Sequence, residues 1–181
     1  HTGDWKIDLD PVVGETIDLD TLKSNSKEIL AMICDSTNVL TKGRSGSESE
    51  VKGNLINLIK HQKNRVFVTS FASNVARLET IAAAAKESKR SLVVLGRSMH
   101  RMISVARQNG ILAEIDIILS EKEASKKRKE EVLYLCTGSQ GEPRGAMMRI
   151  ANQDFPHVDI DQDDTIISVS YTHLRAHETS L

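Results

Sequence analysis

Residues 66–95, VFVTSFASNVARLETIAAAAKESKRSLVVL, decide the fold class because they contain two strands and the helix that joins them. The apolar runs 66–69 and 91–95 have the length and the β-branched composition of buried strands. Between them, apolar residues recur at helical spacing through 75–89, after a Ser-Asn pair that can cap the helix. Strand, helix and strand of these lengths form a βαβ unit, which predicts a parallel sheet with right-handed crossovers.

The same alternation continues on both sides of this unit. Upstream, a helix is expected at 48–61, with Ser47 and Glu48 as capping residues. Downstream, the pattern predicts a turn at 96–98 and then a helix that stops at Asn109-Gly110. Further elements are predicted in the order strand 132–136, helix 146–151 and strand 165–170. The sequence therefore predicts an α/β protein with a Rossmann-like parallel sheet.

The start of the chain has a different pattern. Residues 8–20 are rich in Asp, Pro and Gly and are expected to form a loop. The continuous apolar run 29–34 predicts a strand buried on both faces. Polar residues 35–38 follow it, at the strand end where open α/β sheets bind ligands. Thr-Gly before Asp4 predicts a tight turn, so Asp4 is either a metal ligand at a sheet edge or a turn aspartate that accepts backbone N–H bonds.

Two further stretches leave alternatives open. The charged run 121–131 contains the basic cluster 126–129, which could contact phosphates. Acidic residues flank that cluster, so a solvated helical face is the favoured interpretation. The Gly-rich loop 137–143 lies between a strand and a helix, an arrangement that can present backbone N–H groups to a phosphate. A tight crossover would use the same glycines, and neither the dinucleotide nor the P-loop pattern is present.

Composition narrows the class of protein further. The 24 Lys and Arg nearly balance the 25 Asp and Glu of this 181-residue chain, so its net charge gives no general attraction to nucleic acid. No apolar run approaches the roughly 18 residues of a membrane span, and no signal segment opens the sequence, so a cytoplasmic protein is expected. Cys34 and Cys136 lie in apolar runs without the spacing of a zinc site, so both are expected to be buried, inert thiols.

Five stretches together resemble the ribonuclease J family, which comprises nucleases of the metallo-β-lactamase fold with an inserted β-CASP domain. They occur in the family's order and at about its spacing, from residue 1 to about residue 170. The resemblance implies a partial metallo-β-lactamase segment at 1–40 and a β-CASP domain at 41–170, incomplete at its C-terminal end. The five stretches are HTGDWK at 1–6, DSTN at 35–38, FASN at 71–74, GRSM at 96–99 and CTGSQGEP at 136–143.

The resemblance also implies roles for particular residues. Asp4 would bridge two zinc ions, a pair that activates water for phosphodiester cleavage. Asp35 would be catalytic, beside the metals as a partner of their ligands or as a proton relay, although a helix or turn cap is its alternative. Ser73, Asn74 and Val75 would hold a nucleotide of the RNA, and by themselves they also fit a helix N-cap.

Other parts of the family pattern are expected to lie outside this sequence. The family's His-x-His-x-Asp-His cluster would precede His1, and its later His motifs would follow Leu181. We therefore expect a fragment that cannot assemble the zinc pair and cleaves no RNA, with 1–40 poorly ordered for lack of partner strands. Residues 171–181 depart from the family and resemble translated sequencing-adapter read-through, so they are expected to be a non-native tail. Its two histidines lack the further ligands that zinc requires.

Two functions fit these observations. The resemblance implies part of a zinc-dependent ribonuclease that acts on single-stranded RNA in maturation and decay. Such an enzyme would hydrolyse RNA from 5′ to 3′ as an exonuclease, with endonuclease activity as a further option, and would form a homodimer or a larger homo-oligomer without membrane contact. The alternative is a non-catalytic α/β module that binds a nucleotide or a partner protein.

Overall fold

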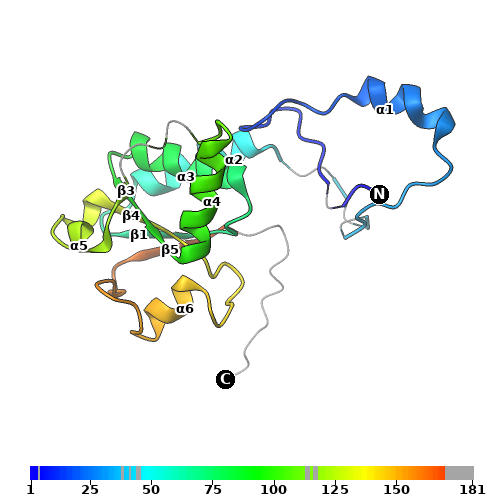
Figure 1. Ribbon diagram of the computed structural model, residues 1–181. Helices are drawn as coiled ribbons and strands as arrows, with labels where there is room; N and C mark the ends of the chain where they lie inside the picture. Colours follow the sequence, from blue (N-terminus) through cyan, green and yellow to red (C-terminus); the bar gives the residue numbers. More distant parts are fainter. Residues whose placement is uncertain are drawn as a thin grey trace.

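A parallel β-sheet forms the centre of the molecule (Figure 1). The computed structural model describes residues 1–3, 5–37, 39–40, 42–43, 46–112, 115 and 118–169. The sheet has five strands in the order β3-β2-β4-β1-β5, and each neighbouring pair is parallel. They are β1 (Val66–Thr69), β2 (Ser91–Leu95), β3 (Ile118–Leu119), β4 (Val132–Cys136) and β5 (Thr165–Ser168). The predicted α/β class and parallel sheet are confirmed.

Helices cover both faces of this sheet and make a three-layer structure. Figure 1 and the two buried clusters place α2, α3 and α4 on one face, and α5 and α6 on the other. Ser47, Asn74 and Ser120 cap α2, α3 and α5, and each accepts a hydrogen bond from the amide three residues later. The helices are α2 (Glu48–Lys60), α3 (Val75–Glu87), α4 (Arg97–Gln108), α5 (Glu121–Ala124) and α6 (Ala146–Ala151).

The two central strands, β1 and β4, are buried along their whole length. Successive side chains of a strand point to opposite faces. Val66 and Val68 accordingly join the apolar cluster beneath α2, α3 and α4, whereas Phe67 joins the cluster beneath α5 and α6. The Phe67 and Tyr134 rings stack with centroids 4.6 Å apart. Burial on both faces explains why these strands are continuous apolar runs rather than alternating ones.

The helices that connect the strands lie on one face of the sheet before β3 and on the other face after it. After β1 and β2 the chain moves toward the β3 edge through α3 and α4. After β3 and β4 it returns toward the β5 edge through α5 and α6. Because parallel crossovers are right-handed, reversing the direction of travel places the second pair of helices on the opposite face. The loops after β2 and β4 therefore diverge, which creates a topological switch point at the carboxyl ends of these strands.

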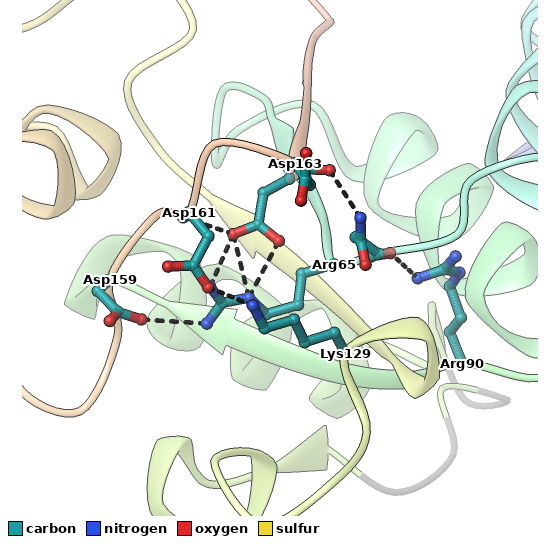
Figure 2. A network of polar contacts seen from close by, with 8 residues as sticks. Arg65, Arg90, Lys129, Asp159, Asp161 and Asp163 are labelled. Atoms are coloured by element: carbon teal, nitrogen blue, oxygen red, sulfur yellow. Dashed lines mark hydrogen bonds and ion pairs between the residues drawn. The ribbon is translucent and has the colours of Figure 1, made fainter.

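A charged cluster joins the amino ends of β1 and β5 (Figure 2). The Arg65 guanidinium donates to Asp164 at 2.7 and 3.1 Å, to Asp161 at 2.7 Å and to Asp159 at 3.1 Å. The Asp164 side chain is fully buried and that of Arg65 is 12% exposed. Lys129 adds a second cation to Asp161. The cluster holds the loop before β5 against the start of β1, where the Arg65 carbonyl also accepts the Thr165 amide.

Arg90 stabilises the same end of the sheet without a carboxylate partner. Its guanidinium donates to the backbone carbonyls of Gln62, Asn64 and Val132 at 2.6 to 3.2 Å. These carbonyls belong to the turn before β1 and to the first residue of β4. Burial lowers the pKa of Arg90 from its ordinary value. One side chain thus donates to three backbone carbonyls and joins the turn before β1 to the start of β4.

The N-terminal segment corrects the sequence prediction for residues 29–34. These residues form no strand, and Leu30 is fully exposed, although a strand buried on both faces was expected. A strand of that kind needs a neighbour on each side, whereas among the described residues the backbone of this run bonds only to the Thr2 amide, at the Ile33 carbonyl, and to the Ser26 carbonyl, at the Ile29 amide. The predicted loop 8–20 ends in a helix, α1 (Leu19–Asn25), followed by a 3₁₀ turn, η1 (Ser26–Glu28).

Smaller differences concern the ends of elements and the thiols. Arg97 and Ser98 belong to α4 rather than to the predicted turn. The charged run forms only the short α5 and a second 3₁₀ turn, η2 (Lys129–Glu131). Cys136 is buried, and burial raises the pKa of its thiol to about 12, whereas Cys34 is only half-buried and lies outside any strand.

The predicted tail at 171–181 lies outside the described residues. None of the helices in the described part of the chain has the length and apolar character needed to cross a bilayer.

We predict that Arg65→Met lowers the free energy of unfolding by about 3 kcal/mol, because it leaves the buried Asp164 carboxylate without its cation. Urea unfolding followed by circular dichroism measures the change. Arg65→Met combined with Asp164→Asn should recover part of the loss, because no unpaired charge then remains buried. Arg101→Met, at an exposed position of α4, is the control and should change stability little. An Arg65→Met protein as stable as the control would contradict this account.

Candidate functional site

Two loops meet at the carboxyl edge of the sheet. The register of β1 and β4 pairs Thr69 with Cys136, so the loops that follow these strands begin side by side. The Ser70 amide donates to the Cys136 carbonyl at 3.0 Å and extends the pairing by one residue beyond the strand. In open α/β sheets this edge is where ligands bind. The first loop leads through residues 71–74 into α3, and the second leads into α6.

The Gly-rich loop after β4 is a tight crossover. Gly138 has a φ of +112°, and a Cβ at this position would lie 2.9 Å from the Met147 Cβ. A Cβ on Gly145 would lie 2.7 Å from the Gly138 Cα, so the two glycines allow the loop to fold against itself. The amides of Ala146 and Met147 donate to the Thr137 hydroxyl and carbonyl. Of the two interpretations of this loop, the structure favours the crossover, since these amides are already used.

Two buried hydroxyl groups lie at this edge, one on the last residue of β1 and one within the Gly-rich loop. The Thr69 and Ser139 side-chain oxygens are buried and have no hydrogen-bond partner among the described residues. The neighbouring Ser168 hydroxyl donates to the Ser139 carbonyl at 3.0 Å. An unsatisfied buried hydroxyl costs about 1–3 kcal/mol, which is a cost that functional edges often carry. Sequence analysis named neither residue as part of a site, because a continuous apolar run shows only that its last residue, Thr69, is buried.

The structure places Ser73, Asn74 and Val75 together at the amino end of α3. Ser73 is exposed, and Asn74 and Val75 are half-buried. The Asn74 Oδ1 accepts the Arg77 amide at 3.1 Å, which confirms the predicted N-cap. No described residue accepts a hydrogen bond from the Asn74 Nδ2, so this amide group is available to a ligand. The free amide group and the positive end of α3 both suit an acceptor-rich or anionic partner.

Asp35 adopts the geometry of a turn cap. Its Oδ1 accepts the Thr37 hydroxyl at 2.6 Å and the Thr37 amide at 2.9 Å. These two bonds hold the pKa of Asp35 below its ordinary value. The Asp35 carbonyl accepts the Trp5 indole N–H at 3.3 Å, which connects the two ends of the N-terminal segment. The geometry matches the capping alternative, and the catalytic role of Asp35 stays a prediction.

The predicted metal ligand, Asp4, lies outside the described residues. Within the described ranges, no group of three or more His, Cys, Asp or Glu side chains could hold a metal ion. The described residues therefore do not by themselves fit a zinc site, which requires three or four such ligands.

Away from this edge, the described residues enclose a hollow of about 300 Å³ between α2, α3 and β2. Lys52, Lys86 and Arg90 contribute to its wall. The Arg90 guanidinium is committed to three backbone carbonyls, as described above. The hollow lies at the amino end of β2, opposite to the edge where ligands of α/β sheets bind. We therefore assign the candidate site to the carboxyl edge.

The fold defines the class as a doubly wound α/β domain, and the carboxyl ends of β1 and β4 form its candidate site. The sequence model described as "Ribonuclease J, beta-CASP domain" matches residues 63–173. The chain belongs to the ribonuclease J family, and its α/β domain corresponds to the family's β-CASP domain.

Three relatives illustrate the similarity. The chain is 40% identical to ribonuclease J of Sinorhizobium meliloti over 173 residues, which is 95% of this chain and 31% of that protein. It is 38% identical to ribonuclease J of Synechocystis sp. over 92% of this chain and 26% of that protein. It is 32% identical to ribonuclease J2 of Bacillus subtilis over 93% of this chain and 31% of that protein. The chain thus spans less than a third of the length of these relatives.

We predict that Gly138→Ala lowers the free energy of unfolding by about 1–3 kcal/mol, because the new Cβ meets Met147 and the φ of +112° is strained for alanine. Gly53→Ala is the matched control. Gly53 lies inside α2 with open space around its Cα, so this substitution should stabilise the protein by about 0.5–1 kcal/mol. Thermal unfolding measures both. Equal effects of the two substitutions would show that the loop does not depend on Gly138.

Proposed function

We propose that this chain is the RNA-holding part of a metal-dependent ribonuclease of the ribonuclease J type. The single observation that carries the proposal is the carboxyl edge of β1 and β4, where the Asn74 amide group, at the start of α3, has no acceptor among the described residues. Membership of the ribonuclease J family supports the reaction class, which is hydrolysis of RNA phosphodiester bonds.

In this proposal a nucleotide of single-stranded RNA lies over the loop of residues 73–75. The Asn74 Nδ2 donates to a base or phosphate oxygen, and the first turn of α3 favours the negative charge of the backbone. Ser73 is exposed and adds a hydroxyl that can donate or accept. Single-stranded RNA suits this loop better than double-stranded RNA does. Its bases are unstacked, so they can turn toward the side chains of the loop.

The metal chemistry belongs to the proposed whole enzyme. Two zinc ions would supply an activated water and stabilise the leaving oxygen, with Asp4 as their bridging ligand and Asp35 nearby. The described residues hold no complete set of metal ligands. The 5′-to-3′ exonuclease activity, the endonuclease activity, the homo-oligomeric state and the cytoplasmic location are further parts of this proposal.

We predict that Asn74→Asp weakens the binding of a fluorescein-labelled hexauridylate about tenfold, as measured by fluorescence anisotropy at constant salt. Aspartate keeps the helix cap but loses the N–H donor and adds a charge that repels phosphate, together worth about 1.4 kcal/mol. Asn57→Asp makes the same charge change at an exposed position of α2 and should leave binding unchanged. Equal binding by both variants would remove Asn74 from the RNA site.

We predict that the 181-residue chain, purified without a tag, holds less than stoichiometric zinc and does not hydrolyse RNA. The reason is that its described residues contain no group of three ligand side chains. Elemental analysis by mass spectrometry and a gel assay of a labelled oligoribonucleotide measure the two quantities. Zinc near two ions per chain together with RNA hydrolysis would show that the chain assembles the metal centre by itself.

A further inference from the structure

Glu48 is a buried carboxylate at the first turn of α2, a position where sequence reasoning expected only a capping residue. It is 8% exposed. Its two oxygens accept the Arg77 Nε at 2.6 Å and the Arg77 Nη2 at 3.0 Å, so the pair is bidentate. The Thr80 hydroxyl donates to the same carboxylate at 3.1 Å. A buried charge with this many partners is held in one orientation, and removing a single partner is costly.

The backbone of Glu48 makes a different connection. Its amide donates to the Asp8 carboxylate at 2.9 Å, across 40 residues of sequence. The same carboxylate accepts the Asp10 amide at 3.0 Å and the Lys6 ammonium at 3.4 Å. Although burial opposes ionisation of Asp8, these donors hold its pKa below the ordinary value. The negative charge lies at the amino end of α2, where the helix dipole favours it.

Arg77 completes a continuous path to the candidate site. Its backbone amide donates to the Asn74 Oδ1, while its guanidinium binds Glu48. Hydrogen bonds therefore run from Asn74 through Arg77 and Glu48 to Asp8. Each link is 3.1 Å or shorter. Neither Glu48 nor Arg77 lies in a recognisable sequence motif, and the two residues are 29 positions apart in the sequence. The sequence therefore gives no signal for this path.

Two further hydrogen bonds join the N-terminal segment to the residues around the first turn of α2. Ser49 donates to the Asp10 carbonyl at 3.0 Å, and Lys6 donates to the Gly46 carbonyl at 2.7 Å. Farther along, residues 12–14 and residues 110–112 line a hollow of about 300 Å³ together with Glu79. The first turn of α2 is thus where the described N-terminal residues are fastened to the α/β domain.

We propose that Glu48 and Arg77 are positioning residues that hold residues 6–10 in a fixed placement relative to the nucleotide loop of residues 73–75. The consequence for catalysis rests on the proposed function, in which that loop holds RNA. Asp4 precedes Lys6 by two residues in the sequence. The Glu48–Arg77 pair therefore couples the part of the chain proposed to bind zinc to the part proposed to bind the nucleotide.

Amide hydrogen exchange of the 181-residue chain tests this coupling at Asp10 and Glu48, whose amides donate to Asp8. Glu48→Gln combined with Arg77→Met removes the ion pair without leaving a buried unpaired charge. We expect exchange at Asp10 and residue 48 to become about tenfold faster, while the amides of β1 and β4 stay protected. Glu87→Gln is the matched control, because it removes the exposed Lys60–Glu87 pair between the same two helices. It should change neither amide.

A second measurement separates positioning from simple stabilisation. Saturating hexauridylate should slow exchange at the Asp10 amide of the unaltered chain, because coupling between two sites is reciprocal. The double variant should still bind hexauridylate but lose this response. Trp5 is the single tryptophan of the chain, so its fluorescence reports the same coupling independently. A merely structural pair would alter the unfolding midpoint without abolishing the response to RNA.

The outcomes also distinguish this inference from the proposed function. If the unaltered chain binds no hexauridylate, the proposed function fails, whereas the exchange comparison without RNA still decides whether the pair positions residues 6–10. Exchange at Asp10 and residue 48 that is equal in the double variant and the unaltered chain would overturn the inference. If the double variant does not fold, Arg77→Lys, which keeps the charge and loses the bidentate fork, is measured in its place.

Discussion

The parallel pairing of β1 with β4 is the constraint on which the rest of this structure depends. Each strand has a further strand on its other side and helices on both faces, so neither has a solvent-facing surface. Polar groups are then confined to the strand ends, because a buried polar group without a partner is costly. The polar groups of the sheet therefore lie at two edges, one at the amino ends and one at the carboxyl ends of the strands, and the two edges differ in their chemistry.

At the amino edge the two buried arginines are fully engaged. Arg65 binds three aspartates and Arg90 binds three carbonyls, which leaves these groups little capacity for a ligand. The carboxyl edge is different, because the Asn74 amide group and the buried hydroxyls of Thr69 and Ser139 have no partner among the described residues. This contrast is the physical basis for assigning the candidate site to one edge of the sheet rather than to the other.

The N-terminal residues show how a correct local pattern can give a wrong element. The apolar run 29–34 has the composition of a central strand, yet it is extended and exposed because no described strand pairs with it. Sheet pairing supplies hydrogen bonds and burial together, so the run alone cannot become a strand. By contrast, the helix caps at Ser47 and Asn74 depend on contacts three residues away, and both were predicted correctly.

The sequence by itself determined the elements whose information is local. These are the α/β class, the caps, and the alternation of strands and helices from residue 48 onward except for the two-residue strand β3, which the sequence pattern did not predict. Only the tertiary structure decided the strand order, the Arg65 cluster and the path from Asn74 through Arg77 and Glu48 to Asp8. The physical reason is distance along the chain. Helical periodicity and capping act within a few residues, whereas the contacts of Arg65 with Asp164 and of Glu48 with Arg77 and Asp8 join residues 29 to 99 positions apart, whose meeting depends on how the whole sheet assembles.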